Sequence, residues 1–455
     1  MKKLFGTSGI RGLANQEVTA ELAAKVGLAL ASYLNEGTVL IGRDTRTSGS
    51  MIEYALTAGL LAGGVSVKKL GIVPTPVLAY LTKRTKADAG VMITASHNPP
   101  RYNGIKIFNS DSTALSEHQQ REIEEILRNG KFKLTTWKEI KSAIESEALV
   151  EYYVDEALEN LTLKKAWRIV VDPGCGATFK LAPEIFRRLG CEVRAVNAQP
   201  DGFFPGRLPL PDENTLKSLC GVVKELKADL GVAYDGDGDR MVLIDENGSF
   251  CSLDRTLASY ASYVVEKEGS GKIVTHVEAS MCIDRMVERV DGVVIRTKVG
   301  DVNIADAIRK HDAIFGGEPC GAWIHPEFHF CPDGILSSVL FLKMLEERGV
   351  SLSEALSVVP SYPILRENVE CPNIIKNEAM KKIEEEIFEV FPNFCEKSTV
   401  DGVRVTLPNG WVLVRPSGTE PLIRITVEAE NREDAEALMG KAKGLVVKAV
   451  KEATK

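Results

Sequence analysis

One pattern of strand-like and helical segments occurs three times along this chain of 455 residues. Each copy has two strand-like runs with helical segments between them, a third run that ends in a loop, and a fourth that returns directly from it. The third runs are 89–93, 228–234 and 313–315. Alternating strands and helices predict parallel sheets joined by helices. Threefold use of the pattern predicts three similar α/β domains with mixed, mostly parallel sheets.

The loop after each third run is expected to carry function. These loops span 96–103, 235–240 and 316–321. Ligands of open parallel sheets bind beyond the carboxyl ends of the strands. If the three domains pack together, their loops can converge on one central cleft.

The pattern changes near residue 360. Prolines at 360, 363 and 372 predict a linker or an extended entry into a new domain. A helical segment over 376–390 follows, and then strand-like runs joined by an Asn-Gly turn that is typical of a hairpin. We therefore expect a C-terminal α+β domain with an antiparallel sheet. The predicted domains are 1–150, 151–252, 253–362 and 363–455, and a helix over 150–163 bridges the first two.

Composition narrows the class of protein. Hydrophobic residues make up 44% and charged residues 26% of the chain, which are ordinary globular values. A net charge of −7 gives no support to a nucleic-acid or anionic-membrane partner. Nine cysteines without a CxxC pair fit reduced thiols, and no apolar run reaches the length of a membrane span. The sequence predicts a soluble cytoplasmic protein.

The segment Asp235-Gly236-Asp237-Gly238-Asp239 is a candidate metal site. Its glycines let the backbone curl so that all three carboxylates face one point. Hard oxygen ligands suit Mg²⁺ or Ca²⁺. A calcium hand is an alternative, but Arg240 stands where its loop requires glycine. An acidic surface turn is a second alternative.

Ser96 follows the apolar run 89–93 within Thr94-Ala95-Ser96-His97-Asn98-Pro99. A strand end holds a side chain rigidly while the turn beyond it is open to ligand. The alternative is an ordinary turn in which a polar side chain bonds its own backbone. Three carboxylates leave Mg²⁺ short of ligands, and a phosphorylated Ser96 would supply a further oxygen.

Two further loops carry groups suited to a sugar phosphate. The segment 415–421, Arg-Pro-Ser-Gly-Thr-Glu-Pro, combines a guanidinium, two hydroxyls and a glycine amide, which suits a phosphate dianion. A hairpin loop with a solvated arginine is the alternative. In the loop 316–321, Glu318 can accept two hydroxyl hydrogen bonds from one sugar, although an ordinary turn fits equally well.

Basic residues near the predicted loop ends form a set that suggests an anionic substrate. Singly, each is better explained as a surface charge or an ion-pair partner. The set is Arg11, Arg43, Arg46, Lys106, Arg240 and Lys298, and Arg424 adds charge beside the loop 415–421.

With these motifs in order, the chain resembles the α-D-phosphohexomutases, the family of phosphoglucomutase, phosphomannomutase and phosphoglucosamine mutase. The resemblance spans essentially the whole chain. Its five motifs are 5–12, 94–99, 235–240, 317–318 and 415–421. It implies four domains around one cleft, one Mg²⁺, and a resting enzyme with phosphoserine at Ser96.

The resemblance also implies a reaction. The phosphoryl group passes from Ser96 to a hexose monophosphate, the resulting 1,6-bisphosphate turns round, and its other phosphate returns to Ser96. The resemblance implies that the metal ion is bound by Ser96, Asp235, Asp237 and Asp239, and that Arg11 and Lys106 transfer protons or stabilise charge. It implies phosphate binding by Arg415, Ser417, Gly418 and Thr419. The other implied substrate contacts are His97, Arg240, Lys298, Glu318, Cys320 and Arg424.

The sugar loop departs from the family pattern, because Cys320 replaces a serine and Ala322 replaces a histidine. Either His325 substitutes for that histidine, or Lys106 and Arg11 suffice. His329 is more simply a loop residue. A non-catalytic sugar-phosphate sensor and a magnesium phosphatase are therefore alternatives to a mutase.

The short amino terminus and Lys298-Val299-Gly300-Asp301 look most like phosphoglucosamine mutases. We expect conversion of glucosamine 6-phosphate to glucosamine 1-phosphate by a monomer or homodimer. A phosphomannomutase or phosphoglucomutase is the alternative within the family.

Overall fold

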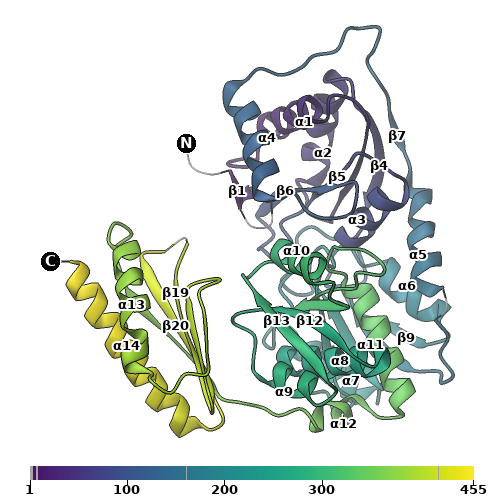
Figure 1. Ribbon diagram of the computed structural model, residues 1–455. Helices are drawn as coiled ribbons and strands as arrows, with labels where there is room; N and C mark the ends of the chain where they lie inside the picture. The colour runs from purple at the N-terminus through teal and green to yellow at the C-terminus, as the bar shows by residue number, and fades with distance from the viewer. Residues whose placement is uncertain (1–3, 7–8, 160, 419, 455) are drawn as a thin grey trace.

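The computed structural model describes residues 4–6, 9–159, 161–418 and 420–454, which form four β-sheets with helices packed against them. Figure 1 shows three of the sheets stacked in one body and the fourth, at the C-terminal end, standing beside it.

The first sheet has seven strands in the order β1-β2-β6-β5-β3-β4-β7. The core strands β3, β4 and β5 run parallel, and β6 returns antiparallel to β5. The elements are β1 (Phe5–Gly6), β2 (Gly9–Leu13), α1 (Ala20–Leu34), β3 (Thr38–Arg43), α2 (Gly49–Ala62), β4 (Ser66–Ile72), α3 (Thr75–Arg84), β5 (Ala89–Ile93), β6 (Tyr102–Asn109), α4 (Glu117–Asn129) and β7 (Ala143–Glu145).

The second sheet has the order β11-β10-β8-β9. A 3₁₀ turn (Glu147–Leu149) and helix α5 (Val150–Leu158) lead into it, so the bridging helix ends earlier than the predicted residue 163. The remaining elements are β8 (Arg168–Asp172), α6 (Leu181–Arg188), β9 (Glu192–Ala195), α7 (Lys217–Glu225), β10 (Leu230–Tyr234) and β11 (Met241–Ile244).

The third sheet has the order β13-β12-β14-β15. Its elements are α8 (Leu253–Glu268), β12 (Gly271–His276), α9 (Cys282–Glu288), β13 (Gly292–Thr297), α10 (Asp301–His311), β14 (Phe315–Glu318), β15 (Ala322–Ile324), α11 (Gly334–Arg348) and α12 (Leu352–Ser357).

Strand β14 differs from the sequence prediction, which placed residues 316–318 in a loop. Gly316 and Gly317 are strand residues, and a Cβ on either would lie within 3 Å of packed side chains such as Ile304 and Leu257. These glycines therefore allow close packing within the sheet and do not mark a turn.

The three sheets share one strand order. In each, the returning strand lies next to the third strand, which lies next to the first, which lies next to the second: β6-β5-β3-β4, β11-β10-β8-β9 and β15-β14-β12-β13. In each, the first three of these strands in chain order are parallel and the last is antiparallel. The prediction of three similar α/β units is confirmed.

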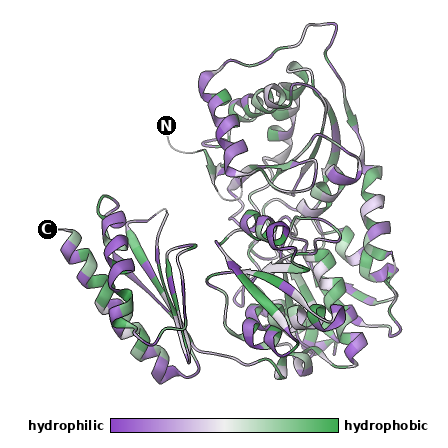
Figure 2. Cartoon of the chain, in the orientation of Figure 1, coloured by the Kyte–Doolittle hydropathy of each residue, from purple (hydrophilic) through white to green (hydrophobic). Residues whose placement is uncertain are grey.

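A continuous apolar core joins these three units. It includes Leu78 of α3, Tyr153 of α5, Phe186 of α6 and Phe341 of α11, all less than 1% exposed. A second core fills the space between the first sheet and α1, α2 and α4. Figure 2 shows much of the hydrophobic colour on the strands, whereas α4 and α13 are largely hydrophilic. The shared core fixes the three strand-end loops relative to one another.

The fourth sheet is antiparallel, as predicted, with the order β16-β20-β19-β18-β17. Its elements are β16 (Ile364–Glu370), α13 (Lys376–Val390), β17 (Glu396–Ser398), β18 (Val403–Leu407), β19 (Gly410–Pro416), β20 (Leu422–Ala429) and α14 (Arg432–Ala453). The segment 360–372 is thus mainly an edge strand paired with β20, and the sequence pattern missed β17, which is largely exposed.

A small apolar cluster attaches the fourth domain to the third. Val277 and Met281 pack there against Trp411 and Leu413. Glu428 is fully buried beside this cluster and accepts hydrogen bonds from the Trp411 indole at 2.6 Å and from the Met281 amide at 2.7 Å. The satisfied carboxylate stabilises the arrangement of the junction seen here. In the part of the chain that the structure describes, no helix is long and apolar enough to cross a membrane.

Candidate active site

Ser96 lies three residues beyond the fully buried strand β5. Its φ of 50° is in the left-handed region that non-glycine residues seldom adopt, and such strain is typical of functional sites. Its amide donates to the Thr94 hydroxyl at 2.8 Å. The side chain is held rigidly, as expected. However, it has no exposed surface, because the hydroxyl faces Asp235 and His97 and not solvent.

Arg46 organises the loop that carries Ser96. All five of its N–H groups are used, at 2.7–2.9 Å, and the side chain is buried. The acceptors are the Asp44 carboxylate and the carbonyls of Ser96, Asn98, Pro99 and Tyr102. The prediction that Arg46 helps to bind an anionic substrate is therefore wrong. Arg43 likewise pairs with Glu53, at 3.0 Å.

The aspartate loop meets Ser96 across two domains. The Ser96 hydroxyl donates to Asp235 Oδ2 at 2.7 Å. Gly236 makes this approach possible, because a Cβ there would lie 2.6 Å from the Ser96 carbonyl oxygen. Asp235, Asp237 and Asp239 are all buried, and each offers an oxygen within 4.8 Å of the others'. The structure thus brings together all four predicted metal-site residues.

The donor set fits a hard divalent cation. Oδ1 of Asp237 and Oδ1 of Asp239 are buried without any hydrogen-bond partner in the described part of the chain. Leaving a buried acceptor unsatisfied costs about 1–3 kcal/mol, and more for a charged group. A cation among these oxygens would remove that penalty, and carboxylate oxygens are preferred ligands of Mg²⁺. Ser96, Asp235, Asp237 and Asp239 are the residues that would hold it.

The calcium-hand alternative is wrong. The aspartate loop joins strands β10 and β11, whereas that motif requires flanking helices. Glu246, at the twelfth position of such a loop, accepts a hydrogen bond from the Ser353 amide at 3.2 Å and so faces another partner.

Lys106 and Thr75 orient the aspartates. The Lys106 ammonium lies 2.8 Å from Asp237 Oδ2 and 2.7 Å from Asp239 Oδ2. The Thr75 hydroxyl donates to the same Asp237 oxygen at 2.5 Å. Among the described residues, these contacts leave the two Oδ1 atoms without a hydrogen-bond donor, although Arg240 Nε lies 3.7 Å from Oδ1 of Asp239. Sequence reasoning missed Thr75, although it follows the end of β4 at the same edge of the sheet.

The pKa values of the aspartates and of Lys106 are set partly by the charges of their neighbours in this cluster. Burial raises the pKa of Asp235 well above its usual range, and the neighbouring Asp239 and Asp237 add to the effect. Burial acts on the Lys106 pKa in the opposite direction, but Asp237 and Asp239 overcome it and raise that pKa. The three carboxylates thus stabilise positive charge nearby, whether on the Lys106 ammonium or on a bound cation.

Arg11, His97 and Arg240 surround Ser96 and the aspartates, as predicted. Arg11 donates to the Asn98 side chain at 3.0 Å, and Arg240 lies 3.7 Å from Asp239. His97 Nδ1 is 3.2 Å from the Ser96 hydroxyl. Burial, followed by the charges of Arg240 and Arg11, lowers the His97 pKa to about 4, so its ring is neutral at pH 7.

The sugar loop lies beside the aspartate loop. The Met241 amide donates to the Gly321 carbonyl at 3.0 Å. Glu318 is buried, and burial together with Asp301 raises its pKa to about 7. Burial also raises the Cys320 pKa to about 12, so this side chain is a neutral thiol. Lys298 is exposed on the segment before α10.

His325 and His329 do not replace the missing histidine of this loop. His325 is buried among the rings of Tyr260 and Phe315, with its Nε2 atom 2.9 Å from the Ser337 hydroxyl. His329 pairs with Asp333 in the interior, at 3.0 Å. The prediction that His325 could act in the cleft is wrong, because it follows the end of β15 and its ring packs in the core.

His276 lies closer to the predicted site, and sequence reasoning missed it. It ends strand β12, and its Nε2 atom is 3.9 Å from Glu318. Its Nδ1 atom accepts a hydrogen bond from the Glu278 amide at 3.1 Å, which assigns the ring proton to Nε2. Its position at the carboxyl end of a parallel strand is the sequence feature that could have identified it as a candidate site residue.

The predicted phosphate loop connects β19 and β20, two inner strands of the fourth sheet. Lys376, another residue that sequence reasoning missed, donates to the carbonyls of Ser417 and Glu420 at 2.7 Å and fixes the loop. Gly418 is exposed, Arg424 pairs with Glu420, and Arg415 pairs with carboxylates of two domains. In the described part of the chain, no hydrogen bond joins this loop to the Ser96 loop. Thr7, Ser8 and Thr419 of the predicted motifs lie outside the described residues.

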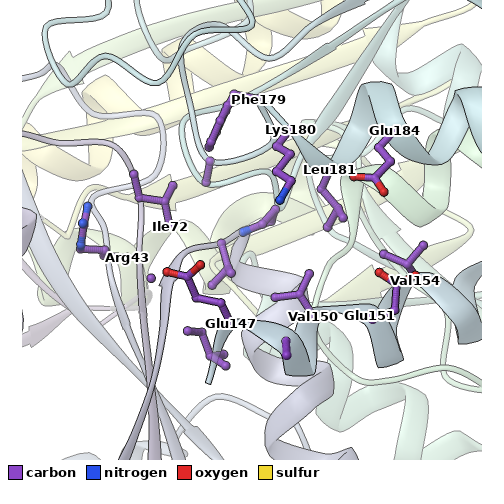
Figure 3. A pocket seen from close by; sticks show the side chains of 16 residues that line it. Arg43, Ile72, Glu147, Val150, Glu151, Val154, Phe179, Lys180, Leu181 and Glu184 are labelled. Carbon is purple, nitrogen blue, oxygen red and sulfur yellow. The ribbon is translucent and has the colours of Figure 1, made fainter. Parts of the chain in front are cut away.

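A cavity of about 730 Å³ lies between the first two domains and α5, behind the aspartate loop. Figure 3 shows Lys180 and Glu147 beside it. Of the residues predicted to serve the site, Arg43 alone lines this cavity. Its wall residue Pro74 precedes Thr75, the partner of Asp237, so the cavity backs onto the site without being part of it.

Four family models match the chain in order. Their descriptions are phosphoglucomutase/phosphomannomutase alpha/beta/alpha domain I over residues 2–134, domain II over 151–248 and domain III over 252–362, and the C-terminal domain over 367–442. The chain therefore belongs to the phosphoglucomutase/phosphomannomutase family, and it is an isomerase that acts as an intramolecular phosphotransferase.

Individual relatives agree. A protein of Methanopyrus kandleri named probable phosphoglucosamine mutase is 47% identical over 99% of both chains. The phosphoglucosamine mutase of Methanococcus maripaludis is 45% identical over 96% of this chain and 97% of its own. A crystal structure of a phosphoglucomutase/phosphomannomutase family protein from Burkholderia thailandensis superposes with a TM-score of 0.89 at 26% identity, covering 99% of this chain and 98% of that one.

Proposed function

We propose that this protein is a phosphoglucosamine mutase that interconverts glucosamine 6-phosphate and glucosamine 1-phosphate through a phosphorylated Ser96 and a bound 1,6-bisphosphate. The observation that carries the proposal is the 2.7 Å contact between the Ser96 hydroxyl and Asp235, beside two buried carboxylate oxygens that have no hydrogen-bond donor among the described residues. The names of the archaeal relatives support the choice of sugar.

The proposed reaction is two phosphoryl transfers. In the first, the bond between phosphorus and Ser96 Oγ breaks while a sugar hydroxyl oxygen bonds to phosphorus. The hydroxyl loses its proton, and Ser96 recovers one. The second transfer reverses these changes at the other end of the sugar. A cation held by the aspartates would offset the charge on the phosphoryl oxygens.

The chain's own residues supply positioning and charge. Lys106, Arg11 and Arg240 place positive charge around Ser96, which suits a transferring phosphoryl group. Glu318 would accept sugar hydroxyls, and the loop 415–421 would hold the phosphate that is not transferred. Because Ser96 has no exposed surface, groups around it must move apart to admit the sugar phosphate.

The test is a comparison of substrates by ³¹P NMR. The protein is incubated with Mg²⁺, a trace of hexose 1,6-bisphosphate, and the 6-phosphate of glucosamine, glucose or mannose. We expect the 1-phosphate signal to appear in all three reactions and fastest with glucosamine.

Each other outcome identifies an alternative. Faster turnover of mannose or glucose phosphate would favour the phosphomannomutase or phosphoglucomutase reading. A growing signal of inorganic phosphate would indicate a phosphatase. Binding without any isomer exchange would indicate a sugar-phosphate sensor and would contradict the proposal.

A further inference from the structure

The predicted phosphate anchor Arg415 is engaged by two carboxylates. Its Nη1 atom lies 2.7 Å from Glu278 Oε1, and its Nη2 atom lies 2.9 Å from Asp401 Oδ2. A guanidinium binds a phosphate through the same two nitrogens. Both of these nitrogens therefore face acidic groups in the arrangement described here.

The two carboxylates come from different domains. Asp401 lies just before β18, in the same domain as Arg415. Glu278 lies two residues beyond strand β12 of the third domain, and its backbone is held by the His276 ring at 3.1 Å. The pair between Glu278 and Arg415 thus spans the domain junction, whereas Asp401 stays with Arg415 if the fourth domain moves.

We propose that Glu278 occupies the place on Arg415 that a substrate phosphate takes, and so acts as a positioning residue that weakens phosphate binding and is displaced when the substrate arrives. This inference rests on the proposed function of the loop 415–421. A carboxylate and a phosphate dianion are both acceptors for a bidentate arginine, so they compete for the same donors.

The partial exposure of the pair limits the size of the effect. The side chains of Arg415 and Glu278 are 27% and 30% exposed. Partly exposed ion pairs are screened and contribute modestly. We therefore expect removal of the Glu278 charge to tighten phosphate binding about threefold to tenfold.

Removing this charge should leave the domain junction intact. Glu428, Trp411 and Met281 join the two domains independently of Glu278. Glu430 offers a matched control, because it also pairs across the junction, with Arg285 at 3.7 Å, whereas the ion-pair partners of Arg415 are Glu278 and Asp401.

The test is isothermal titration of the full-length protein with inorganic phosphate at fixed ionic strength. Glu278→Gln and Glu430→Gln are compared with the unmodified protein, and each is also made in an Arg415→Ala background. KM and kcat for glucosamine 6-phosphate are measured in parallel. We expect Glu278→Gln to lower both the phosphate Kd and KM about threefold to tenfold, Glu430→Gln to change neither, and the Glu278 effect to vanish without Arg415.

The contrary outcomes are distinct. If Arg415→Ala weakens phosphate binding but Glu278→Gln leaves Kd and KM unchanged, or weakens binding, then Glu278 does not compete for Arg415 and the proposed function still stands. If Arg415→Ala has no effect on phosphate binding, the role of the loop 415–421 is wrong, and the inference about Glu278 is wrong with it.

Discussion

Replacing Ser96 with alanine is expected to slow isomer exchange by about four orders of magnitude or more. The hydroxyl is the atom that accepts and returns the phosphoryl group, and loss of a nucleophile removes the covalent route completely. The fold should survive, because Asp235 keeps its hydrogen bond from the Gly238 amide at 3.0 Å. The measurement is the initial rate of 1-phosphate formation by ³¹P NMR with bisphosphate present.

Ser262 provides the control for this prediction. It is also a buried serine, but its hydroxyl donates to the Ser259 carbonyl within helix α8, far along the chain from the cleft loops. Ser262→Ala should change the exchange rate less than about twofold. A Ser96→Ala variant that keeps full turnover would show that the serine mechanism is wrong.

The second large effect is expected at Arg46. Replacing it with methionine removes all five donors and leaves the buried Asp44 carboxylate and four carbonyls without them. Breaking a buried ion pair from one side costs about 3–5 kcal/mol. Local opening of the Ser96 loop should become about 10²- to 10⁴-fold more frequent, since each 1.4 kcal/mol is a factor of ten. Hydrogen exchange of peptides covering 94–104, followed by mass spectrometry, measures this opening.

Arg43→Met is the matched control, because Arg43 ends strand β3, three residues before Arg46, but makes a partly exposed pair with Glu53. We expect it to change exchange of the 94–104 segment less than about tenfold. Arg46→Lys should be intermediate, since an ammonium offers three donors in place of five. Unchanged protection in Arg46→Met would mean that the loop is held by other contacts.

The repeated units were predictable because turn residues mark the ends of their apolar strands in the sequence. Strand β5 has the predicted limits, 89–93, and β10 has the predicted end at Tyr234, because each is an apolar run that ends at a turn. The glycines of β14 were wrongly predicted to form a loop, because close packing and turns use the same residue type. The edge strand β17 has no such pattern, since it packs few side chains.

The convergence of Ser96 with the three aspartates was predictable from the strand-end rule. The functions of the basic residues could not be predicted in this way. Arg46 lies just after β3 and Arg415 lies near the end of β19, but one is buried under four carbonyls and the other faces two carboxylates from different domains. Several of these contacts join residues far apart in the chain, such as Arg46 with the Ser96 carbonyl and Arg415 with Glu278, and no local pattern encodes them. The contact of His276 with Glu318 was missed for the same reason.

The most direct test of the whole account is the ³¹P NMR spectrum of the phosphorylated protein with Mg²⁺ and then with Mn²⁺. In the proposed mechanism, a divalent ion held by Asp235, Asp237 and Asp239 lies against a phosphate on Ser96. A phosphoserine resonance that depends on Ser96 should therefore be visible with Mg²⁺ and broadened beyond detection by stoichiometric Mn²⁺, and Asp237→Asn combined with Asp239→Asn should restore it. A phosphoserine signal that stays sharp with bound Mn²⁺, or that persists in Ser96→Ala, would contradict the account.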